Sequence, residues 1–247
     1  MSITGPDELA GMRAAGAIVR RMLEAMKRAV RSGITTAELD EVGAIVMREH
    51  GAQSAPQLVY KFPGVNCISL NDEAVHGIPA NREVQAGDLV KLDVTIEKDG
   101  FMADAAETVG VGKVSEEGQR LIACAERAFT KAMLVARVGF RVSDIGRVVE
   151  REVRRSGFSV IRDLGGHGIG RTIHEEPRVP NYADPQANQV LTEGLVITVE
   201  PIIAAGSGRA VVAKDGWTVR TADRRPSAHY EHTLVVTRRE PILLTAM

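Results

Sequence analysis

Hydrophobic positions near the start of the chain recur every three or four residues. Between Asp7 and Arg31 they are Leu9, Met12, Ile18, Val19, Met22 and Met26. This spacing predicts an amphipathic helix whose methionines belong to the core. A second helix is predicted to begin at Thr35, because Thr35 and Glu38 have the spacing of a capping box, and to end at Gly51, which suits a left-handed C-cap.

The same order of patterns returns later in the chain. A helical pattern from Ser115 to Arg137 is followed by a charged amphipathic stretch between two glycines, with Ser143 as the candidate N-cap. The segment Gly139–Gly157 is as long as Gly33–Gly51. This repetition indicates two similar halves.

Strand-like runs follow each helix pair. They are Val90–Ile96 and Phe101–Val109 in the first half, and Leu195–Val199, Val211–Ala213 and Tyr230–Thr237 in the second. Helices grouped ahead of hairpins favour an α+β fold, with helices over one face of an antiparallel sheet. We expect a single catalytic domain, 1–247, whose pseudo-symmetric halves cover roughly 7–110 and 115–247 and enclose one site.

Composition narrows the class of protein. A chain of 247 residues with 44% hydrophobic residues can bury a large core. The net charge of −1 argues against a protein that chiefly binds nucleic acid or an anionic membrane, although local basic patches are compatible with it. Charges interrupt the first hydrophobic positions, and no stretch of about 18 residues is free of charge, so neither a signal peptide nor a membrane span is expected. Cys67 and Cys124 form no C-x-x-C pair, which fits a cytoplasmic protein without disulfides.

The first chemical signal is a pair of carboxylates. Alternation puts Asp93 on the strand face opposite to that of Val90, Leu92, Val94 and Ile96. If Lys98 and Asp99 are the central residues of the following turn, Asp104 lies directly opposite Asp93. Two like charges in such a position favour a bound divalent cation. A solvated hairpin with two unrelated acids explains this segment equally well.

Glycines surround His167 in Gly165–Gly170, and His174 follows seven residues later. Glycine lets the backbone approach a ligand closely. The glycine spacing matches neither dinucleotide-binding nor Walker A motifs, and the segment beginning at His174 lacks the second histidine of a zincin motif. A single histidine is more often structural, whereas this pair favours a functional site.

Two glutamates complete the candidate set. Glu200 ends the apolar run Leu195–Val199, and Glu231 shares a strand face with His229 and Thr233. Either glutamate alone is explained by an ion pair or by surface exposure. Four carboxylates and one histidine on separate strands, however, form a ligand set suited to two ions of Co, Mn or Fe(II), with a bridging hydroxide as the nucleophile.

The motifs that carry these residues occur in the order typical of one family. They are His76-Gly-Ile-Pro, Lys91-Leu-Asp93-Val-Thr, Gly165-Gly-His167-Gly-Ile-Gly-Arg-Thr-Ile-His174-Glu-Glu-Pro, Thr198-Val-Glu200-Pro, Asp215-Gly-Trp-Thr-Val and His229-Tyr-Glu231-His-Thr-Leu-Val-Val-Thr. Over nearly its whole length the chain resembles the type I methionine aminopeptidases of the pita-bread fold.

The resemblance implies a role for each metal-binding residue. Asp93 would chelate one ion, Asp104 and Glu231 would bridge both, and His167 with Glu200 would complete the second site. Glu200 is also similar to the residue that transfers a proton from the attacking water.

The resemblance further assigns the groups that meet the substrate. His76 and His174 are similar to uncoordinated histidines that contact the substrate and stabilise the tetrahedral intermediate. Four side chains stand at positions similar to the methionine pocket, although ordinary core packing explains them as well: Phe62, Cys67, Ile173 and Trp217.

Three features depart from the family pattern. Ala105-Ala106 replaces a hydroxyl-bearing pair, Ile173 stands where an aromatic residue is common, and His229 replaces a residue that is often glutamine. None of these changes removes an expected ligand. They alter the shape of the pocket and the hydrogen bonds around the metals.

By resemblance, the substrate is a nascent chain that begins with methionine and has a small second residue. The short span from Glu200 to Glu231, and the start of the chain close to its first helix, favour a compact bacterial-type enzyme. We expect a monomer with transient ribosome contact, without membrane or specific nucleic-acid binding. Two alternatives are a proline-directed peptidase of the same fold and a catalytically inactive protein that binds a peptide, ribosome or chromatin partner.

Overall fold

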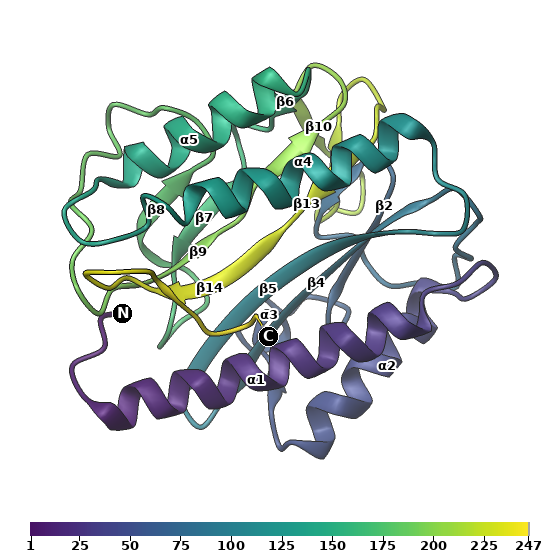
Figure 1. Ribbon diagram of the computed structural model, residues 1–247. Helices are drawn as coiled ribbons and strands as arrows, with labels where there is room; N and C mark the ends of the chain where they lie inside the picture. Colours follow the sequence, from purple (N-terminus) through teal and green to yellow (C-terminus); the bar gives the residue numbers. More distant parts are fainter. Residues whose placement is uncertain (247) are drawn as a thin grey trace.

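A large antiparallel sheet forms the centre of the molecule in the computed structural model, which describes residues 1–246 (Figure 1). Met247, the last residue of the expected domain, lies outside this range. The nine-stranded sheet has the order β1-β4-β5-β14-β9-β7-β8, with β2 beside β4 and β15 beside β14. Its strands are β1 (Gln53–Ser54), β2 (Cys67–Leu70), β4 (Leu89–Lys98), β5 (Phe101–Gly110), β7 (Gly165–Gly168), β8 (Glu175–Pro180), β9 (Val196–Val199), β14 (Glu231–Val235) and β15 (Ile242–Leu243).

Two small sheets adjoin the large one. The first has the order β13-β10-β6 and the second β11-β12-β3. Their strands are β3 (Glu73–Val75), β6 (Ser159–Val160), β10 (Ile202–Ala204), β11 (Ala210–Val212), β12 (Val219–Thr221) and β13 (Ser227–His229). Most of these short strands carry no long alternating pattern, so sequence analysis identified only β11 among them.

Two helix pairs cover the large sheet, as predicted (Figure 1). The helices are α1 (Pro6–Ala29), α2 (Thr36–Glu49), α3 (Ala55–Tyr60), α4 (Glu116–Ala132) and α5 (Val142–Arg155). One apolar cluster joins α1 and α2 to β4 and β5, and another joins α4 and α5 to β9 and β14. Met12, Met22 and Met26 are fully buried, which confirms the core role predicted for them.

The ends of α2 agree with the sequence, whereas those of the later helices differ. Thr35 and Glu38 form the expected capping box, and Gly51 adopts φ 62°. α4 ends at Ala132, not Arg137, because the chain turns away so that the Val138 N–H donates to the Thr237 carbonyl (2.9 Å).

The N-cap predicted at Ser143 is wrong. Helix α5 begins at Val142, and Arg141 is its N-cap. The Asp144 carboxylate accepts the Arg141 N–H (2.8 Å), which takes over the capping role, while the Ser143 N–H donates to the Ala187 carbonyl (2.8 Å).

The hairpin between β4 and β5 has a different register from the one predicted. Its central residues are Asp99 and Gly100, with φ of 51° and 82°, so the turn is one residue later than expected. Asp93 therefore pairs with Ala106, and Asp104 pairs with Thr95. The prediction that Asp93 and Asp104 are directly opposite is wrong, but a shift of two residues leaves both on one face.

Alternation along the central strands separates the core from the site. Val90, Leu92, Val94 and Ile96 are fully buried in the cluster under α1 and α2, as predicted. Asp93 and Asp104 point to the opposite face of the same hairpin. The helix-covered face therefore supplies the core, and the other face carries the polar side chains.

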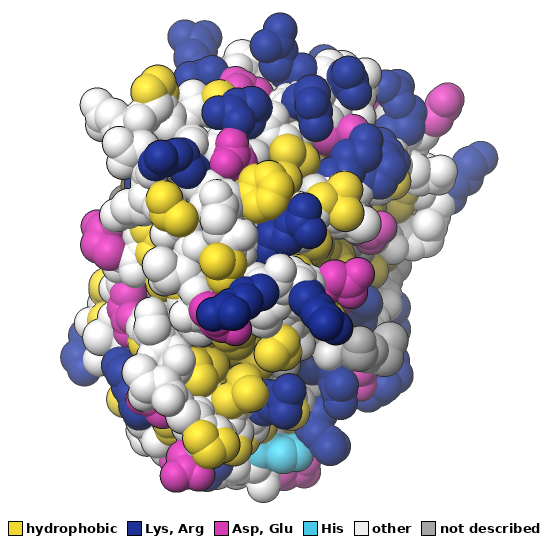
Figure 2. Space-filling model, turned by 60° about the vertical axis from the view of Figure 1, so that its left-hand side comes forward, with side chains coloured by type: hydrophobic (Ala, Val, Ile, Leu, Met, Phe, Trp, Pro, Cys, Tyr) yellow, Lys and Arg dark blue, Asp and Glu magenta, His cyan; other side chains and the backbone are white. Residues whose placement is uncertain are grey.

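The surface is mixed in charge. Lys and Arg side chains gather over the upper part of the face in Figure 2, with Asp and Glu among them, and α5 alone contributes Arg147, Arg151, Arg154 and Arg155. Local basic patches thus coexist with the net charge of −1. Within residues 1–246, none of the helices combines the length and the apolar composition needed to cross a membrane.

Replacing Thr35 with alanine tests the start of α2. Thr35→Ala removes the side-chain acceptor of the Glu38 N–H (3.1 Å), and we expect it to lower the free energy of unfolding by about 1 kcal/mol. Thr35→Ser keeps the hydroxyl and should remain close to the parent protein. Urea denaturation followed by circular dichroism measures both, and equal losses for the two variants would contradict the cap.

Candidate metal centre

The candidate ligands occupy two neighbouring rows across the large sheet. In the first row, Ala106 pairs with both Asp93 and Glu231, and Glu200 stands beside Glu231 because Val199, which precedes it, pairs with His232. The small Ala106 side chain leaves space between the carboxylates on either side of it.

The second row lies two residues away from the first on each strand. There Thr95 pairs with Asp104, Thr233 pairs with Thr198, and hydrogen bonds join the two pairs. His167 extends this row, since its N–H donates to Thr198 Oγ1 (3.1 Å). The five expected ligands thus come from five strands or strand ends and meet at one place.

The carboxylates of this centre are buried together. Asp104, Glu200 and Glu231 are 6%, 8% and 2% exposed. Burial raises the pKa of each of these three well above its ordinary value, and the charges of neighbouring carboxylates raise it further. The pKa of Asp93 is also raised, and burial is the main cause. Asp104 Oδ1 and Glu231 Oε1 have no hydrogen-bond partner among the described residues.

These oxygens fit a bound cation. A divalent ion would satisfy the unpartnered oxygens and remove most of the repulsion between the carboxylates. One ligand atom each from Asp104, His167 and Glu231 lies within 4.8 Å of the others, and the same holds for Glu200, His229 and Glu231. The two groups share Glu231, which is the arrangement expected for two neighbouring ions.

His167 is oriented for coordination through Nε2. Its Nδ1 lies 2.9 Å from the Gly168 carbonyl, so Nδ1 carries the proton and donates it there. Nε2 is left with a lone pair and faces Glu200 Oε1 at 3.6 Å. Burial lowers the pKa of His167 to about 3, which keeps the ring neutral as a metal ligand requires.

Two threonines to which sequence analysis gave no role hold the acidic residues in place. Thr198 Oγ1 donates to Glu200 Oε1 (3.2 Å), while Thr233 Oγ1 donates to the Asp104 carbonyl (2.7 Å) and accepts the Asp104 N–H (2.9 Å). Each threonine is two residues from a ligand on its own strand. The same two-residue alternation that revealed the ligands could therefore have revealed these partners.

The centre opens into a cavity of about 380 Å³. Besides the five ligands, this cavity is lined by every other residue expected at the site: His76, His174, Phe62, Cys67, Ile173 and Trp217. Phe62 and Trp217 pack edge to face with ring centroids 5.3 Å apart, and they make part of the wall apolar. The binding roles of these residues remain predictions.

Two neutral histidines face the cavity near the ligands. Burial lowers the pKa of His76 to about 4, and burial also lowers the pKa of His174. The ring of His174 lies 4.2 Å from that of His167 between centroids. The Tyr60 hydroxyl lies 2.5 Å from His174 Nδ1; no sequence motif pointed to this tyrosine, because it comes from the unexpected short helix α3.

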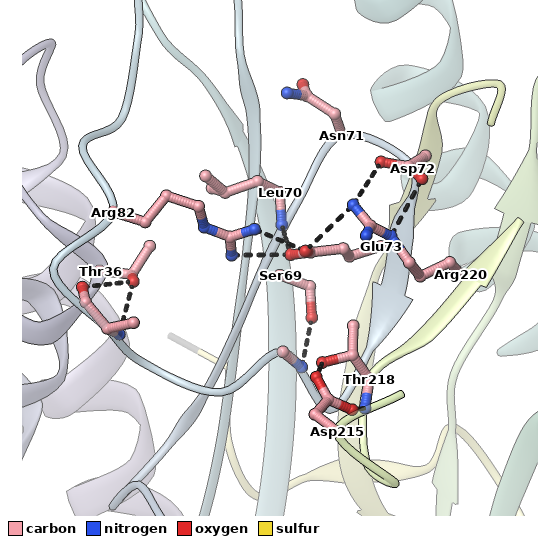
Figure 3. Close-up of polar contacts among 12 residues, drawn as sticks. Thr36, Ser69, Leu70, Asn71, Asp72, Glu73, Arg82, Asp215, Thr218 and Arg220 are labelled. Atoms are coloured by element: carbon pink, nitrogen blue, oxygen red, sulfur yellow. Dashed lines mark hydrogen bonds and ion pairs between the residues drawn. The ribbon is translucent and has the colours of Figure 1, made fainter. Parts of the chain in front are cut away.

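An ion-pair network supports the segment that carries His76 (Figure 3). Glu73, 4% exposed on β3, accepts two hydrogen bonds from Arg82 (2.5 and 2.8 Å) and lies 3.4 Å from Arg220 on β12. Beyond β3, the Gly77 N–H donates to Ser69 Oγ (2.9 Å). His76 itself has φ 57°, so its backbone is held in a left-handed turn between these fixed points.

The loop with Trp217 is fixed to the same segment. Asp215 accepts hydrogen bonds from the backbone N–H groups of Trp217 and Thr218 (2.9 Å each) and from the Thr218 hydroxyl (2.7 Å). Val219 pairs with Val75. The two sides of the cavity that carry His76 and Trp217 are therefore joined by one small sheet.

Two further buried side chains near the centre, Cys67 and Lys91, have structural rather than chemical roles. Burial and the nearby carboxylates raise the pKa of Cys67 well above its ordinary value, so its thiol is not an activated nucleophile. Lys91, which sequence analysis passed over, is 1% exposed and donates to the carbonyls of Asn71 (2.6 Å) and Ser227 (3.3 Å). It ties β4 to β13 at the edge of the centre.

Comparison with known proteins places the chain in a family. Residues 10–238 match the model of metallopeptidase family M24. The chain is 45% identical to methionine aminopeptidase 2 of Bacillus subtilis over all of both chains. It is 43% identical to the methionine aminopeptidase of Clostridium perfringens over 97% of this chain and 96% of that protein.

Solved structures agree with these relatives. The methionine aminopeptidase of Rickettsia prowazekii superposes with a TM-score of 0.94 at 36% identity, and that of Thermotoga maritima with 0.96 at 33%, each over all of both chains. The Pyrococcus horikoshii prolidase, at 21% identity, shares the fold over 99% of this chain and 63% of that one, with a TM-score of 0.80.

These similarities confirm the pita-bread fold and the metal-dependent peptidase class inferred from the motifs. The full-length coverage and the identity of 39–45% extend the match well beyond the ligand motifs. The chain belongs to metallopeptidase family M24 and, within it, to the methionine aminopeptidases.

Proposed function

We propose that this protein removes the N-terminal methionine from peptides and nascent proteins and prefers a small second residue. The observation that carries this proposal is the meeting of three buried carboxylates, the half-buried Asp93 and His167 at a cavity with an apolar wall. In keeping with the names of its relatives, the substrate is a peptide whose first residue is methionine. The whole described chain forms one catalytic domain with two similar halves.

We assign five metal ligands in two overlapping groups. Asp93, Asp104 and Glu231 would hold one divalent ion, while His167 and Glu200, together with Asp104 and Glu231, would hold the second. The burial of Asp104, His167, Glu200 and Glu231 and the unpartnered oxygens of Asp104 and Glu231 support this assignment. Co, Mn and Fe(II) suit such an oxygen-rich set with a single imidazole.

Divalent ions held by these residues would supply Lewis acidity for the scissile carbonyl and would lower the pKa of a bound water at neutral pH. Glu200 receives the proton of the attacking water and passes it to the leaving amine. The Thr198 hydroxyl, which donates to Glu200 Oε1 (3.2 Å), fixes the carboxylate for this transfer.

His76 and His174 orient the substrate and stabilise the tetrahedral intermediate. Because burial lowers the pKa of both, their rings are neutral at pH 7 and can donate hydrogen bonds without adding a charge. The short contact between the Tyr60 hydroxyl and His174 Nδ1 (2.5 Å) fixes the orientation of that ring.

The methionine side chain lies against Phe62, Cys67 and Trp217. The edge-to-face packing of Phe62 and Trp217 gives this wall a fixed shape, and such a wall discriminates by fit. We further propose that the enzyme acts in the cytoplasm as a monomer, with transient contact to the ribosome during synthesis of its substrates.

A peptide assay tests the activity. Metal-free protein supplied with Co, Mn or Fe(II) should release methionine from Met-Ala-Ser, because the second residue is small. An X-Pro peptide should remain uncleaved, which separates this activity from that of a proline-directed peptidase. Mass spectrometry follows both reactions, and cleavage of X-Pro alone would reject the proposal in favour of the alternative.

Substitution of one shared ligand tests the centre. Asp104→Asn removes a charge that both ions need, and we expect the release of methionine to fall by at least about a hundredfold. The matched control is Asp99→Asn in the turn of the same hairpin, where the side chain is 78% exposed. Near-normal turnover of Asp104→Asn would contradict the ligand assignment.

Metal binding should also stabilise the fold. Because the ions relieve the repulsion between buried carboxylates, addition of Co(II) or Mn(II) at about 100 times the dissociation constant should add about 2.7 kcal/mol to the free energy of unfolding. Thermal denaturation measures this as a higher melting temperature. Potassium chloride of equal ionic strength is the control, and an equal rise with that salt would argue against a specific site.

A further inference from the structure

His229 is a buried histidine beside the metal centre that the ligand assignment above does not use. It is the last residue of β13 and is 2% exposed. Neither Nδ1 nor Nε2 has a hydrogen-bond partner among the described residues. Three residues away, the buried His232 has both ring nitrogens within hydrogen-bond distance of hydroxyls, Thr245 at 2.9 Å and Tyr230 at 3.2 Å.

The ring of His229 is aimed at the carboxylates. Its Nε2 lies 3.3 Å from Glu231 Oε2 and 3.7 Å from Glu200 Oε2. The separation of the assigned ligands His167 Nε2 and Glu200 Oε1 is 3.6 Å, which falls within the same range. The two oxygens of Glu200 thus each face the Nε2 atom of a different histidine.

The distances from His229 Nε2 to the two carboxylates are closer to the distance between two ligand atoms on one ion than to the length of a hydrogen bond. A charge-assisted N–H···O bond is about 2.7–2.9 Å long. Two atoms that each lie about 2.1 Å from an ion, at angles between those of octahedral and trigonal sites, are about 3.0–3.6 Å apart. His229 Nε2 therefore stands where a third ligand would be, next to Glu200 and Glu231.

The backbone holds the imidazole in this position. The His229 N–H donates to Thr108 Oγ1 (2.8 Å), and the Thr108 hydroxyl donates back to the His229 carbonyl (2.8 Å). Ile202 pairs with His229 in the β10–β13 ladder.

We propose that His229 is a sixth protein ligand of the centre and binds, through Nε2, an ion that Glu231 also binds. This inference rests on the proposed dinuclear function. It gives the centre two imidazole donors, His167 and His229, among its carboxylates. Imidazole suits cobalt and zinc better than manganese, so His229 shifts the preference of the centre towards Co(II) and away from Mn(II).

The Co(II)-loaded protein gives a readout that does not depend on turnover. Each imidazole bound through Nε2 carries a proton on Nδ1, and Co(II) shifts that N–H signal far outside the ordinary proton NMR range. The wild-type protein should show two such signals, one each from His167 and His229. The burial of both rings slows the exchange of these protons with water.

Two variants separate coordination from hydrogen bonding. His229→Gln keeps a hydrogen-bond donor near Glu200 and Glu231 but removes the imidazole. This variant should lose one shifted signal and bind Co(II) at least about tenfold more weakly. Its affinity for Mn(II) should fall less. His229→Ala should behave like His229→Gln. Calorimetric titration of metal-free protein measures the affinities, and His232→Gln is the control for loss of a buried histidine.

The outcomes are distinct. A single shifted signal in the wild type would overturn coordination by His229. Coordination would also be overturned if His229→Gln retained its Co(II) affinity while His229→Ala lost it, and that result would assign His229 a hydrogen-bonding role. If the wild type shows one signal yet cleaves Met-Ala-Ser, only the role of His229 fails. If it neither binds Co(II) nor cleaves the peptide, the proposed function fails as well.

Discussion

Repulsion among buried carboxylates is the constraint on which the rest of this structure depends. Asp104, Glu200 and Glu231 converge from neighbouring strands with almost no access to water, and the half-buried Asp93 stands beside them. Charges of one sign in such a place separate or take up protons unless the scaffold holds them and a cation compensates them. Two helix pairs on the opposite face supply the apolar burial that keeps the strands together against this repulsion.

Periodicity was sufficient to predict which face carries the chemistry. The alternation around Asp93 and Glu231, and the capping box at Thr35, depend on local sequence and are found in the structure as expected. The register of the hairpin was not predictable with the same certainty, because Lys98-Asp99-Gly100 allows two placements of a two-residue turn and only backbone φ values decide between them. Strand alternation indicated the candidate ligands, and the ordered motifs assigned a role to each.

The features of the site that could not be predicted from the sequence depend on contacts between distant segments. The Glu73–Arg82–Arg220 network brings together three separate parts of the chain, and the buried Lys91 resembles an ordinary surface lysine until Asn71 is placed beside it. From the sequence, His229 was noted only as a neighbour of Glu231 on one strand face and as a departure from a family pattern. Its unpartnered ring nitrogens became visible once β13 and β14 were placed beside Glu200.

The tight turn at Asp99 and Gly100 also limits how this hairpin can change in evolution. Because side chains alternate, adding or deleting one residue in β5 ahead of Asp104 would turn that carboxylate into the core beneath α1 and bring Ala103 or Ala105 to the metals. A change of two residues would preserve the face and alter only the row. Length variation in this part of the chain is therefore tolerable in even steps, so alignment gaps of odd length would mark relatives that have lost the centre.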